Sequence, residues 1–195
     1  MKKRALLLID MQVDFCEGGS LAVKGGDGLA ARLALHLQDI MNQRTFGSSK
    51  YAALIASRDA HIDPLEHFSN KPDFQNTWPI HCKQGSPGFE LHPALRDFPF
   101  DACFDKGAYS AGYSAFEGST EDGLCLADWL SLKGISQLDL AGIALEHCVK
   151  ATALDALKLG FETNLLCDYC LAINPSKANM VYRRLSLAGA GLIRA

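Results

Sequence analysis

The sequence lacks the features that would point to a membrane or a nucleic acid. Its 195 residues contain no apolar run long enough to cross a bilayer. The stretch MKKRALLLID resembles a secretory leader, but its apolar part is too short before Asp10, so we expect no signal peptide. Lys and Arg number 19 against 22 Asp and Glu, and the net charge is -3. Without a basic excess for phosphate backbones, we expect neither nucleic acid nor membrane as a partner.

The sequence also lacks the cysteine pattern of a disulfide-stabilised protein. Its seven cysteines are odd in number and scattered through apolar segments, which favours a reducing, cytoplasmic location. Cys167 and Cys170 form a C-x-x-C motif, but no second pair lies at zinc-finger spacing. We therefore interpret these two cysteines as structural rather than as a redox pair.

No repeat, linker or low-complexity segment divides the chain, and its length is typical of one domain, expected over residues 1–195. Apolar runs typical of strands alternate with helical patterns, as in β-α-β units. The predicted strands cover residues 4–9, 51–57, 102–105, 137–143, 162–167 and 190–193. This pattern predicts a three-layer α/β fold in which helices flank a mostly parallel central sheet.

The predicted helices lie between these strands. Asp27 is the candidate N-cap of a helix with an apolar face formed by Leu29, Leu33, Leu37, Ile40 and Met41. Further helices are expected at about 122–133, from Cys148 to Gly160, and after the cap formed by Asn174 and Pro175. Residues 58–120 should be mostly ordered loop, and long loops in compact domains are usually functional.

Four apolar runs lead to residues that can do chemistry. ALLLI ends at Asp10, AALIAS leads to Asp59, ACFD precedes Lys106, and LDLAGI comes shortly before Cys148. In a parallel sheet, the residues just past the carboxyl ends of the strands meet in one crevice. We therefore expect a carboxylate, an amine, a thiol and a metal site at this edge of the sheet.

Cys148 is the candidate nucleophile. It follows a predicted strand closely, near the first turn of a helix, where N–H groups and the helix dipole stabilise a thiolate. A buried and inert cysteine is the commoner case. Lys106 would lower the thiol pKa further if it reached the crevice, and Asp10 could take and return the proton. His147 is a rival base, but adjacent helical residues do not face each other, so we expect it to point away from the sulfur.

One carboxylate and three imidazoles form a candidate metal site. They belong to Asp59, His61, His67 and His81, a ligand set that suits zinc or ferrous iron. Glu66 beside His67 suggests a metalloprotease at first sight. The H-E-x-x-H order of that class is absent, however, so we do not favour it.

Five segments of the chain together resemble a known family. They are LLLIDMQVDFCEGGSLAV, SRDAHIDPLEHFS, WPIHCKQGSPG, FDKGAYSAGYSAFEG and AGIALEHCVKATALDA. Their order and spacing, over nearly the whole length, resemble the nicotinamidases and pyrazinamidases of the isochorismatase-like cysteine hydrolase family. The resemblance implies the isochorismatase-like α/β fold. It also implies the hydrolysis of nicotinamide to nicotinate and ammonia, and a role in NAD salvage.

The resemblance also implies particular catalytic residues. The triad would be Asp10, Lys106 and Cys148, and the backbone N–H groups of Ala144 and Cys148 would form the oxyanion hole. The bond between Ile143 and Ala144 matches a non-proline cis peptide of the family. A thioester on Cys148 is the implied intermediate.

Binding residues follow from the same resemblance. Asp59, His61, His67 and His81 would hold one divalent metal ion, with Zn²⁺ as the first choice and Fe²⁺ or Mn²⁺ as alternatives. Aromatic walls formed by Phe15, Trp78 and Tyr113 would enclose the pyridine ring of the substrate. Leu145 and Glu146 replace smaller or more polar residues of the family, so the fine shape of the pocket stays open.

Three other functions deserve comparison with this one. A related amidohydrolase acting on a different small amide, or an isochorismatase, could use the same scaffold. A metallohydrolase could instead activate water with Cys148 as a bystander. A domain without catalysis could bind a metal or a small aromatic ligand. The sequence does not identify the metal, and it does not show whether pyrazinamide is a substrate. It also does not determine the oligomeric state, for which a homo-oligomer is one alternative.

Overall fold

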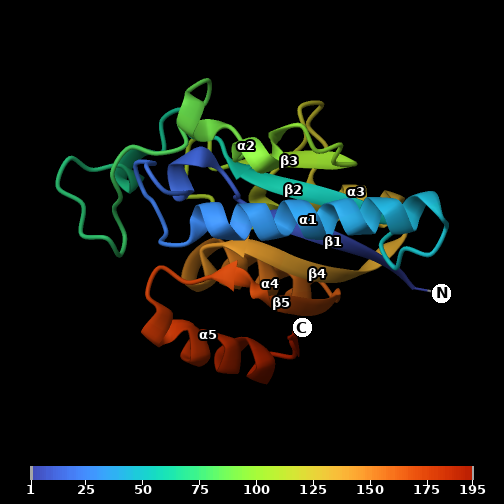
Figure 1. Ribbon diagram of the computed structural model, residues 1–195. Coiled ribbons are helices and arrows are strands. Elements are labelled where there is room, and N and C mark those ends of the chain that lie inside the picture. Colours follow the sequence, from blue (N-terminus) through green and yellow to red (C-terminus); the bar gives the residue numbers. More distant parts are fainter. Residues whose placement is uncertain (1, 195) are drawn as a thin grey trace.

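A computed structural model describes residues 2–194 and shows one sheet of six parallel strands between two layers of helices (Figure 1). The strand order is β3-β2-β1-β4-β5-β6. The strands are β1 (Lys3–Ile9), β2 (Ala53–Asp59), β3 (Ala102–Lys106), β4 (Ile135–Ile143), β5 (Glu162–Leu171) and β6 (Gly191–Ile193). The predicted three-layer α/β fold is confirmed.

The side chains of β1 point alternately to the two faces of the sheet, and this explains the three layers. Leu6 and Leu8 point into the core beneath one helical layer, whereas Leu7 and Ile9 point into the core beneath the other. The first layer holds α1 (Gly26–Thr45) and α2 (Pro93–Arg96), and the second holds α3 (Leu126–Leu132), α4 (Lys150–Lys158) and α5 (Pro175–Leu187). Both faces of β1 are buried, as expected of the strands of a parallel sheet. None of the helices within residues 2–194 has both the length and the apolar character that crossing a bilayer requires.

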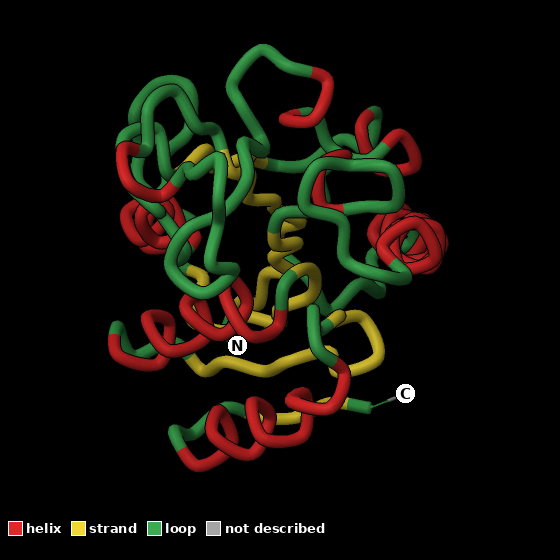
Figure 2. The backbone as a smooth tube through the Cα atoms, turned by 90° about the vertical axis from the view of Figure 1, so that its left-hand side faces the viewer, coloured by secondary structure: helices red, strands yellow, loops and turns green. Residues whose placement is uncertain are grey.

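The strand order creates a switch point between β1 and β4. The chain moves outward in one direction from β1 to β3 and then returns to the other side of β1 to form β4. Loops gather at one end of the sheet, on the left in Figure 1 and toward the viewer in Figure 2. Short helical turns lie within the connections: η1 (Val13–Phe15), η2 (Leu65–His67), η3 (Pro87–Phe89), η4 (Ala115–Glu117) and the π-helical η5 (Leu145–Val149). Ligands of open parallel sheets bind beside such a switch point.

Several predicted boundaries were wrong. The N-cap of α1 is Gly25, in a left-handed conformation with φ of 92°, and Asp27 lies in the first turn. The Glu17 carboxylate accepts the backbone N–H groups of Gly25 and Asp27, so capping comes from a distant side chain. The helix after β4 begins at Leu145, before the predicted start at Cys148, because a π turn precedes α4. Helix α3 is shorter than predicted, and β5 is longer.

The cysteines are consistent with the structural interpretation of the C-x-x-C motif. All seven are free thiols. Cys167 and Cys170 lie buried within β5, and their sulfur atoms are 3.7 and 3.8 Å from the carbonyl oxygens of Leu165 and Leu140. Both thiols therefore lie in the packed core and contact backbone carbonyl groups of the sheet.

Candidate active site and metal centre

The sheet register brings three of the predicted site residues together. Asp59 and Lys106 are the last residues of β2 and β3 and lie opposite each other in the parallel pairing. Asp10 comes directly after β1, and its backbone N–H donates to the carbonyl oxygen of Ser57 at 3.1 Å. It adopts a left-handed conformation with φ of 51°, uncommon for a non-glycine residue.

Lys106 lies at the centre of the catalytic candidates. Its ammonium nitrogen is 2.9 Å from Asp10 Oδ2 and 3.7 Å from the sulfur of Cys148, and it donates a short hydrogen bond to Asp59. All four side chains are buried. The hydroxyl group of Ser57 donates to the other oxygen of Asp10 at 2.7 Å. The predicted triad of Asp10, Lys106 and Cys148 is thus one contiguous cluster that also touches a predicted metal ligand.

Burial dominates the acid–base properties of this cluster. It raises the pKa of Asp10, although the Lys106 ammonium opposes that rise. Burial alone would lower the pKa of Lys106, but Asp10 and Asp59 outweigh it and raise that pKa well above its ordinary value. At Asp59 burial is the largest single effect, but the same ammonium and the His61 ring together outweigh it and hold the pKa of the carboxyl group below the usual range. Lys106 is therefore a charged ammonium that keeps a neighbouring carboxylate ionised.

Cys148 differs from the thiolate that its position in the sequence predicts. Burial raises its thiol pKa well above the ordinary value, and Lys106 counteracts only part of this rise. A hydrogen bond to the Asp10 carboxylate further favours the protonated thiol. Cys148 is the fourth residue of the π-helical η5, and its side chain is only 6% exposed. Desolvation therefore outweighs the helix terminus, and the sulfur needs a base beside it to become an anion.

The three predicted histidine ligands form one cluster beside Asp59. One ring nitrogen from each of His61, His67 and His81 lies within 4.8 Å of the other two. Asp59 Oδ2 is 3.8 Å from His61 Nε2 and 3.9 Å from His81 Nε2. The three imidazole nitrogens are thus close enough together to share a single ion, and the Asp59 carboxylate lies next to two of them.

The protonation of the histidines fits a divalent cation. Nδ1 of His61 lies 2.6 Å from the carbonyl oxygen of Gly107, and Nδ1 of His81 lies 2.8 Å from that of Pro79. A carbonyl oxygen only accepts, so both Nδ1 atoms carry hydrogen and both Nε2 atoms keep a lone pair. Within residues 2–194, neither His61 Nε2 nor His67 Nδ1 has a hydrogen-bond partner, although both are buried. Such orphaned lone pairs are what a bound metal ion would satisfy.

Burial also keeps two of these ligands neutral. It lowers the pKa of His67 to about 4, and it lowers the pKa of His81 as well. Metal binding requires the neutral imidazole, so near neutral pH these rings need not release a proton before binding. Together with Asp59, the donor set suits a divalent metal.

Two residues that sequence reasoning missed hold the metal ligands in place. The amide group of Gln12 accepts from the backbone N–H of Asp59 and donates to its carbonyl oxygen, both at 2.8 Å. It also donates to the carbonyl oxygen of Phe89 at 2.7 Å. Gly107 has φ of 75°, and a Cβ atom there would lie 2.8 Å from the His61 ring. The signal was present in the sequence, because Gln12 and Gly107 follow Asp10 and Lys106 closely, but only tertiary structure shows what they contact.

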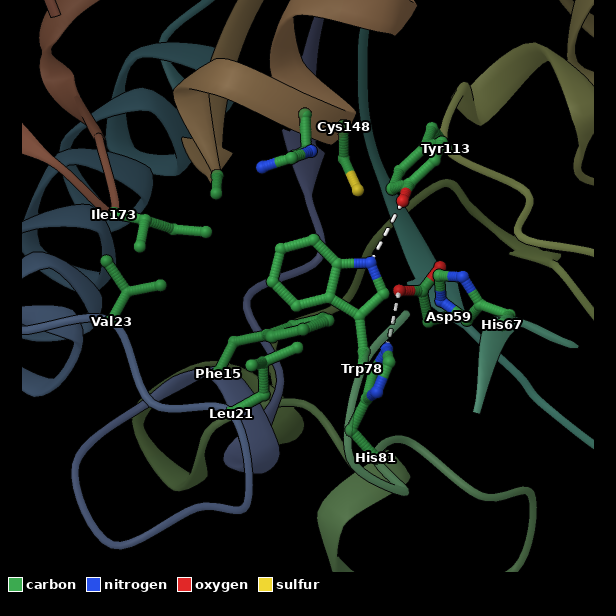
Figure 3. A pocket seen from close by; sticks show the side chains of 12 residues that line it. Phe15, Leu21, Val23, Asp59, His67, Trp78, His81, Tyr113, Cys148 and Ile173 are labelled. Carbon is green, nitrogen blue, oxygen red and sulfur yellow. Dashed lines mark hydrogen bonds and ion pairs between the residues drawn. The ribbon is translucent and has the colours of Figure 1, made fainter. Parts of the chain in front are cut away.

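An aromatic pocket opens beside the sulfur of Cys148 (Figure 3). Phe15, Trp78 and Tyr113, the predicted substrate walls, all line it, and the indole N–H of Trp78 donates to the hydroxyl oxygen of Tyr113 at 3.0 Å. Asp59 and two of the histidines lie on one side of Trp78, and apolar side chains lie on the other (Figure 3). The apolar side consists of Leu21, Val23 and Ile173, none of which we predicted. The pocket thus offers stacking surfaces, an apolar wall and a polar, metal-binding wall.

His147 was expected to point away from the sulfur of Cys148, and the structure shows its side chain as part of the pocket wall. Its ring lines the same pocket as Cys148. The ring centroid lies 5.6 Å from that of Tyr113, in a stacked arrangement, and 5.1 Å from that of Trp78, in an edge-on arrangement. Within residues 2–194, no hydrogen bond or ion pair joins this ring to Cys148. Burial lowers its pKa, so it is a neutral wall residue. Its approach to the pocket reflects the wider π turn of η5, which the sequence pattern did not reveal.

Ala144 is the other predicted oxyanion residue. It lines the pocket between β4 and η5, and the bond that precedes it, Ile143–Ala144, is a cis peptide. The structure therefore places Ala144 and Cys148 in the lining of the same pocket.

This combination of fold and site defines an α/β protein with a Cys-Lys-Asp cluster next to a histidine-rich metal centre. A family model described as the isochorismatase domain matches residues 4–195, and the chain belongs to that family. A curated nicotinamidase/pyrazinamidase of Mycobacterium tuberculosis is 40% identical over 190 residues, which cover 97% of this chain and 98% of the relative.

Solved structures show the same similarity. The pyrazinamidase of Pyrococcus horikoshii in complex with zinc is 33% identical, with a TM-score of 0.81 and coverage of 99% of both chains. PnC1 from L. infantum in complex with nicotinate is 31% identical, with a TM-score of 0.82 and coverage of 99% of this chain and 93% of the other.

Proposed function

We propose that this chain is a nicotinamidase, a hydrolase that converts nicotinamide to nicotinate and ammonia. The observation that carries the proposal is the single cluster of Asp10, Lys106 and Cys148 at the base of an aromatic pocket with a metal-binding wall. The named relatives in bacteria, and a neighbour crystallised with nicotinate, support the same substrate.

The pocket is suited to a planar pyridine carboxamide. Phe15, Trp78 and Tyr113 would enclose the ring, and its amide group would lie next to Cys148. Asp59, His61, His67 and His81 would hold a divalent ion, which would supply a coordination position for the ring nitrogen, directly or through water. Zinc is the ion we propose, because the P. horikoshii relative was crystallised with it, and Fe²⁺ or Mn²⁺ would fit the same donors.

The first half of the reaction forms a thioester. Asp10 takes the thiol proton while the sulfur of Cys148 attacks the amide carbon, and the carbonyl oxygen becomes an oxyanion that the N–H groups of Ala144 and Cys148 stabilise. Asp10 then gives this proton to the amide nitrogen, the C–N bond breaks, and ammonia leaves. Lys106 stabilises the charge of Asp10 and of the forming thiolate throughout.

The second half releases the acid. Asp10, again a carboxylate, takes a proton from water, and the hydroxide adds to the thioester carbon. The C–S bond breaks as the oxyanion collapses, and the thiol recovers its proton from Asp10. The nicotinic acid gives its proton to solvent and leaves as nicotinate, and the cluster has returned to its starting protonation.

A substrate comparison tests this function directly. Purified, metal-loaded protein should release ammonia from nicotinamide and form an equal amount of nicotinate, and pyrazinamide is a second expected substrate. Hydrolysis of an unrelated small amide in preference to both pyridine and pyrazine amides would favour the alternative amidohydrolase. Absence of ammonia release from nicotinamide would contradict the proposal.

A further inference from the structure

A second groove lies outside the catalytic pocket and is continuous with it. The two share four lining residues: Leu21, Trp78, His147 and Ile173. The outer groove continues over one face of α5, where Lys177, Met180, Val181 and Arg184 follow one another at helical spacing. Phe74, 60% exposed and edge-on to Trp78, also lines this groove. We call this outer groove the vestibule.

The vestibule carries a positive charge on a chain with a negative net charge. Lys150, Lys177 and Arg184 line it, with Glu146 as the acidic lining residue. Glu146 is already engaged, because its two carboxylate oxygens accept the backbone N–H groups of Ile173 and Asn174 at 2.9 and 2.8 Å. The lining is therefore positive overall, and the remaining negative charge serves to hold the start of α5.

The three cations have no partner on the protein. Across residues 2–194, no side-chain hydrogen bond or ion pair forms at Lys150, Lys177 or Arg184. Lys177 lies in the first turn of α5, which contains no acidic residue and where the helix dipole disfavours a cation. Both Lys150 and Lys177 lower the pKa of His147, after the larger effect of burial, so their field extends to the wall of the catalytic pocket. Lys177 is thus an unpaired cation in a locally unfavourable position, and departures of this kind from local preference occur at functional sites.

We propose that the vestibule is a product site that takes an aromatic carboxylate, the acid leaving the catalytic pocket; this rests on the proposed function. Its cations attract the carboxylate, and Trp78, Ile173 and Met180 offer an apolar surface to the ring. The amide substrate has the same ring but no charge. Charge is therefore the property by which the vestibule distinguishes product from substrate, and it draws the acid outward after hydrolysis.

Equilibrium dialysis of labelled nicotinate against the metal-loaded enzyme at low ionic strength tests this site. Two binding sites per chain are expected, one in the pocket and one in the vestibule. The double variant Lys150→Gln/Lys177→Gln should weaken the vestibule site by about threefold to tenfold, the range expected for two exposed ion pairs. Its KM for nicotinamide should change by less than about twofold, because a neutral amide does not respond to these charges.

A matched control separates this local effect from net charge. Lys158→Gln/Arg183→Gln also removes one cation from α4 and one from α5, but neither residue lines the vestibule. This control should bind nicotinate like the wild type. Equal losses in both double variants, unchanged binding in the first, or a parallel rise in its KM for nicotinamide would overturn the proposal. If the wild type failed to hydrolyse nicotinamide while Lys150→Gln/Lys177→Gln still weakened nicotinate binding, the anion site would be supported and the proposed function rejected.

Discussion

At the scale of single residues, the site depends on one buried ammonium shared by two carboxylates and a thiol. Lys106 is 2% exposed, and an unpaired charge at that depth would be strongly unfavourable. Its contacts with Asp10 and Asp59 offset the desolvation and join the acid–base cluster to the metal centre. Cys148 stays a thiol until substrate arrives, because burial and its hydrogen bond to Asp10 both disfavour the anion. In the mechanism we propose, proton transfer to Asp10 is therefore part of the attack and not a separate earlier ionisation.

Removal of the nucleophile should separate catalysis from metal binding. Cys148→Ala is expected to lower ammonia release from nicotinamide by at least about a thousandfold, as loss of a nucleophile does in other hydrolases. The metal content should equal that of the wild type, because none of the four metal donors comes from Cys148. Elemental analysis measures the metal content, and an ammonia assay on the same preparation measures the loss of turnover. Retained turnover would instead favour water activated by the metal.

Removal of the Gln12 amide should loosen the metal centre. Gln12→Leu leaves the backbone N–H of Asp59 and two buried carbonyl groups without their partner. We expect the free energy of unfolding to fall by about 2–4 kcal/mol and metal affinity to drop by about tenfold. Urea unfolding and a metal-competition titration measure these changes. Gln38→Leu, on the exposed face of α1, is the control and should stay within about 0.5 kcal/mol of the wild type.

At the scale of secondary-structure elements, strand ends place the chemistry. Asp10, Asp59 and Lys106 follow or end three neighbouring strands, and Cys148 follows β4 through the π turn. Hydrophobic periodicity was enough to predict these strands, and the convergence of parallel strand ends was enough to predict that the residues meet. Periodicity could not show that η5 is π-helical, so the start of the helix was missed, and the contribution of His147 to the pocket wall was not predicted.

One close approach between strands sets the spacing at this edge. Gly142 near the end of β4 has φ of 132°, and a Cβ atom there would collide with the carbonyl oxygen of Ile9 on β1. Gly142→Ala should therefore force the two strands apart and lower the free energy of unfolding by several kcal/mol, with loss of activity. Gly134→Ala is the control, because Gly134 also has a positive φ but open space around it. That variant should lose only about 1–2 kcal/mol in a thermal or urea melt. Equal losses in the two variants would contradict the role of strand contact.

At the scale of the whole molecule, the two cores hold the sheet rigid while the loops at one end carry function. The fold followed from the sequence because both cores rest on regular alternation, as in β1 and α1. The candidate metal donors could be predicted because histidines stand out in a loop. The vestibule was not found, because Lys150 and Lys177 are ordinary surface residues until α4 and α5 bring them beside the pocket. Charges gathered from distant segments leave no local pattern in a sequence.

Metal removal should affect stability as well as activity. A metal ion bound to Asp59 and the three histidines stabilises the native state and not the unfolded chain, so the melting temperature should fall after chelation. Ammonia release should fall with it, and both should return when Zn²⁺, Mn²⁺ or Fe²⁺ is restored. Differential scanning calorimetry of the metal-loaded and chelated protein checks the shift. An unchanged melting temperature combined with full activity after verified removal of metal would exclude the metal centre.

The account rests on an acyl group carried by the sulfur of Cys148. Acid quenching during turnover with nicotinamide, followed by mass spectrometry of the digested protein, tests this most directly. We predict a nicotinoyl adduct on the peptide that contains Cys148, absent when substrate is omitted and absent in Cys148→Ala. Rapid turnover without any such adduct, together with undiminished activity in Cys148→Ala, would contradict the covalent mechanism.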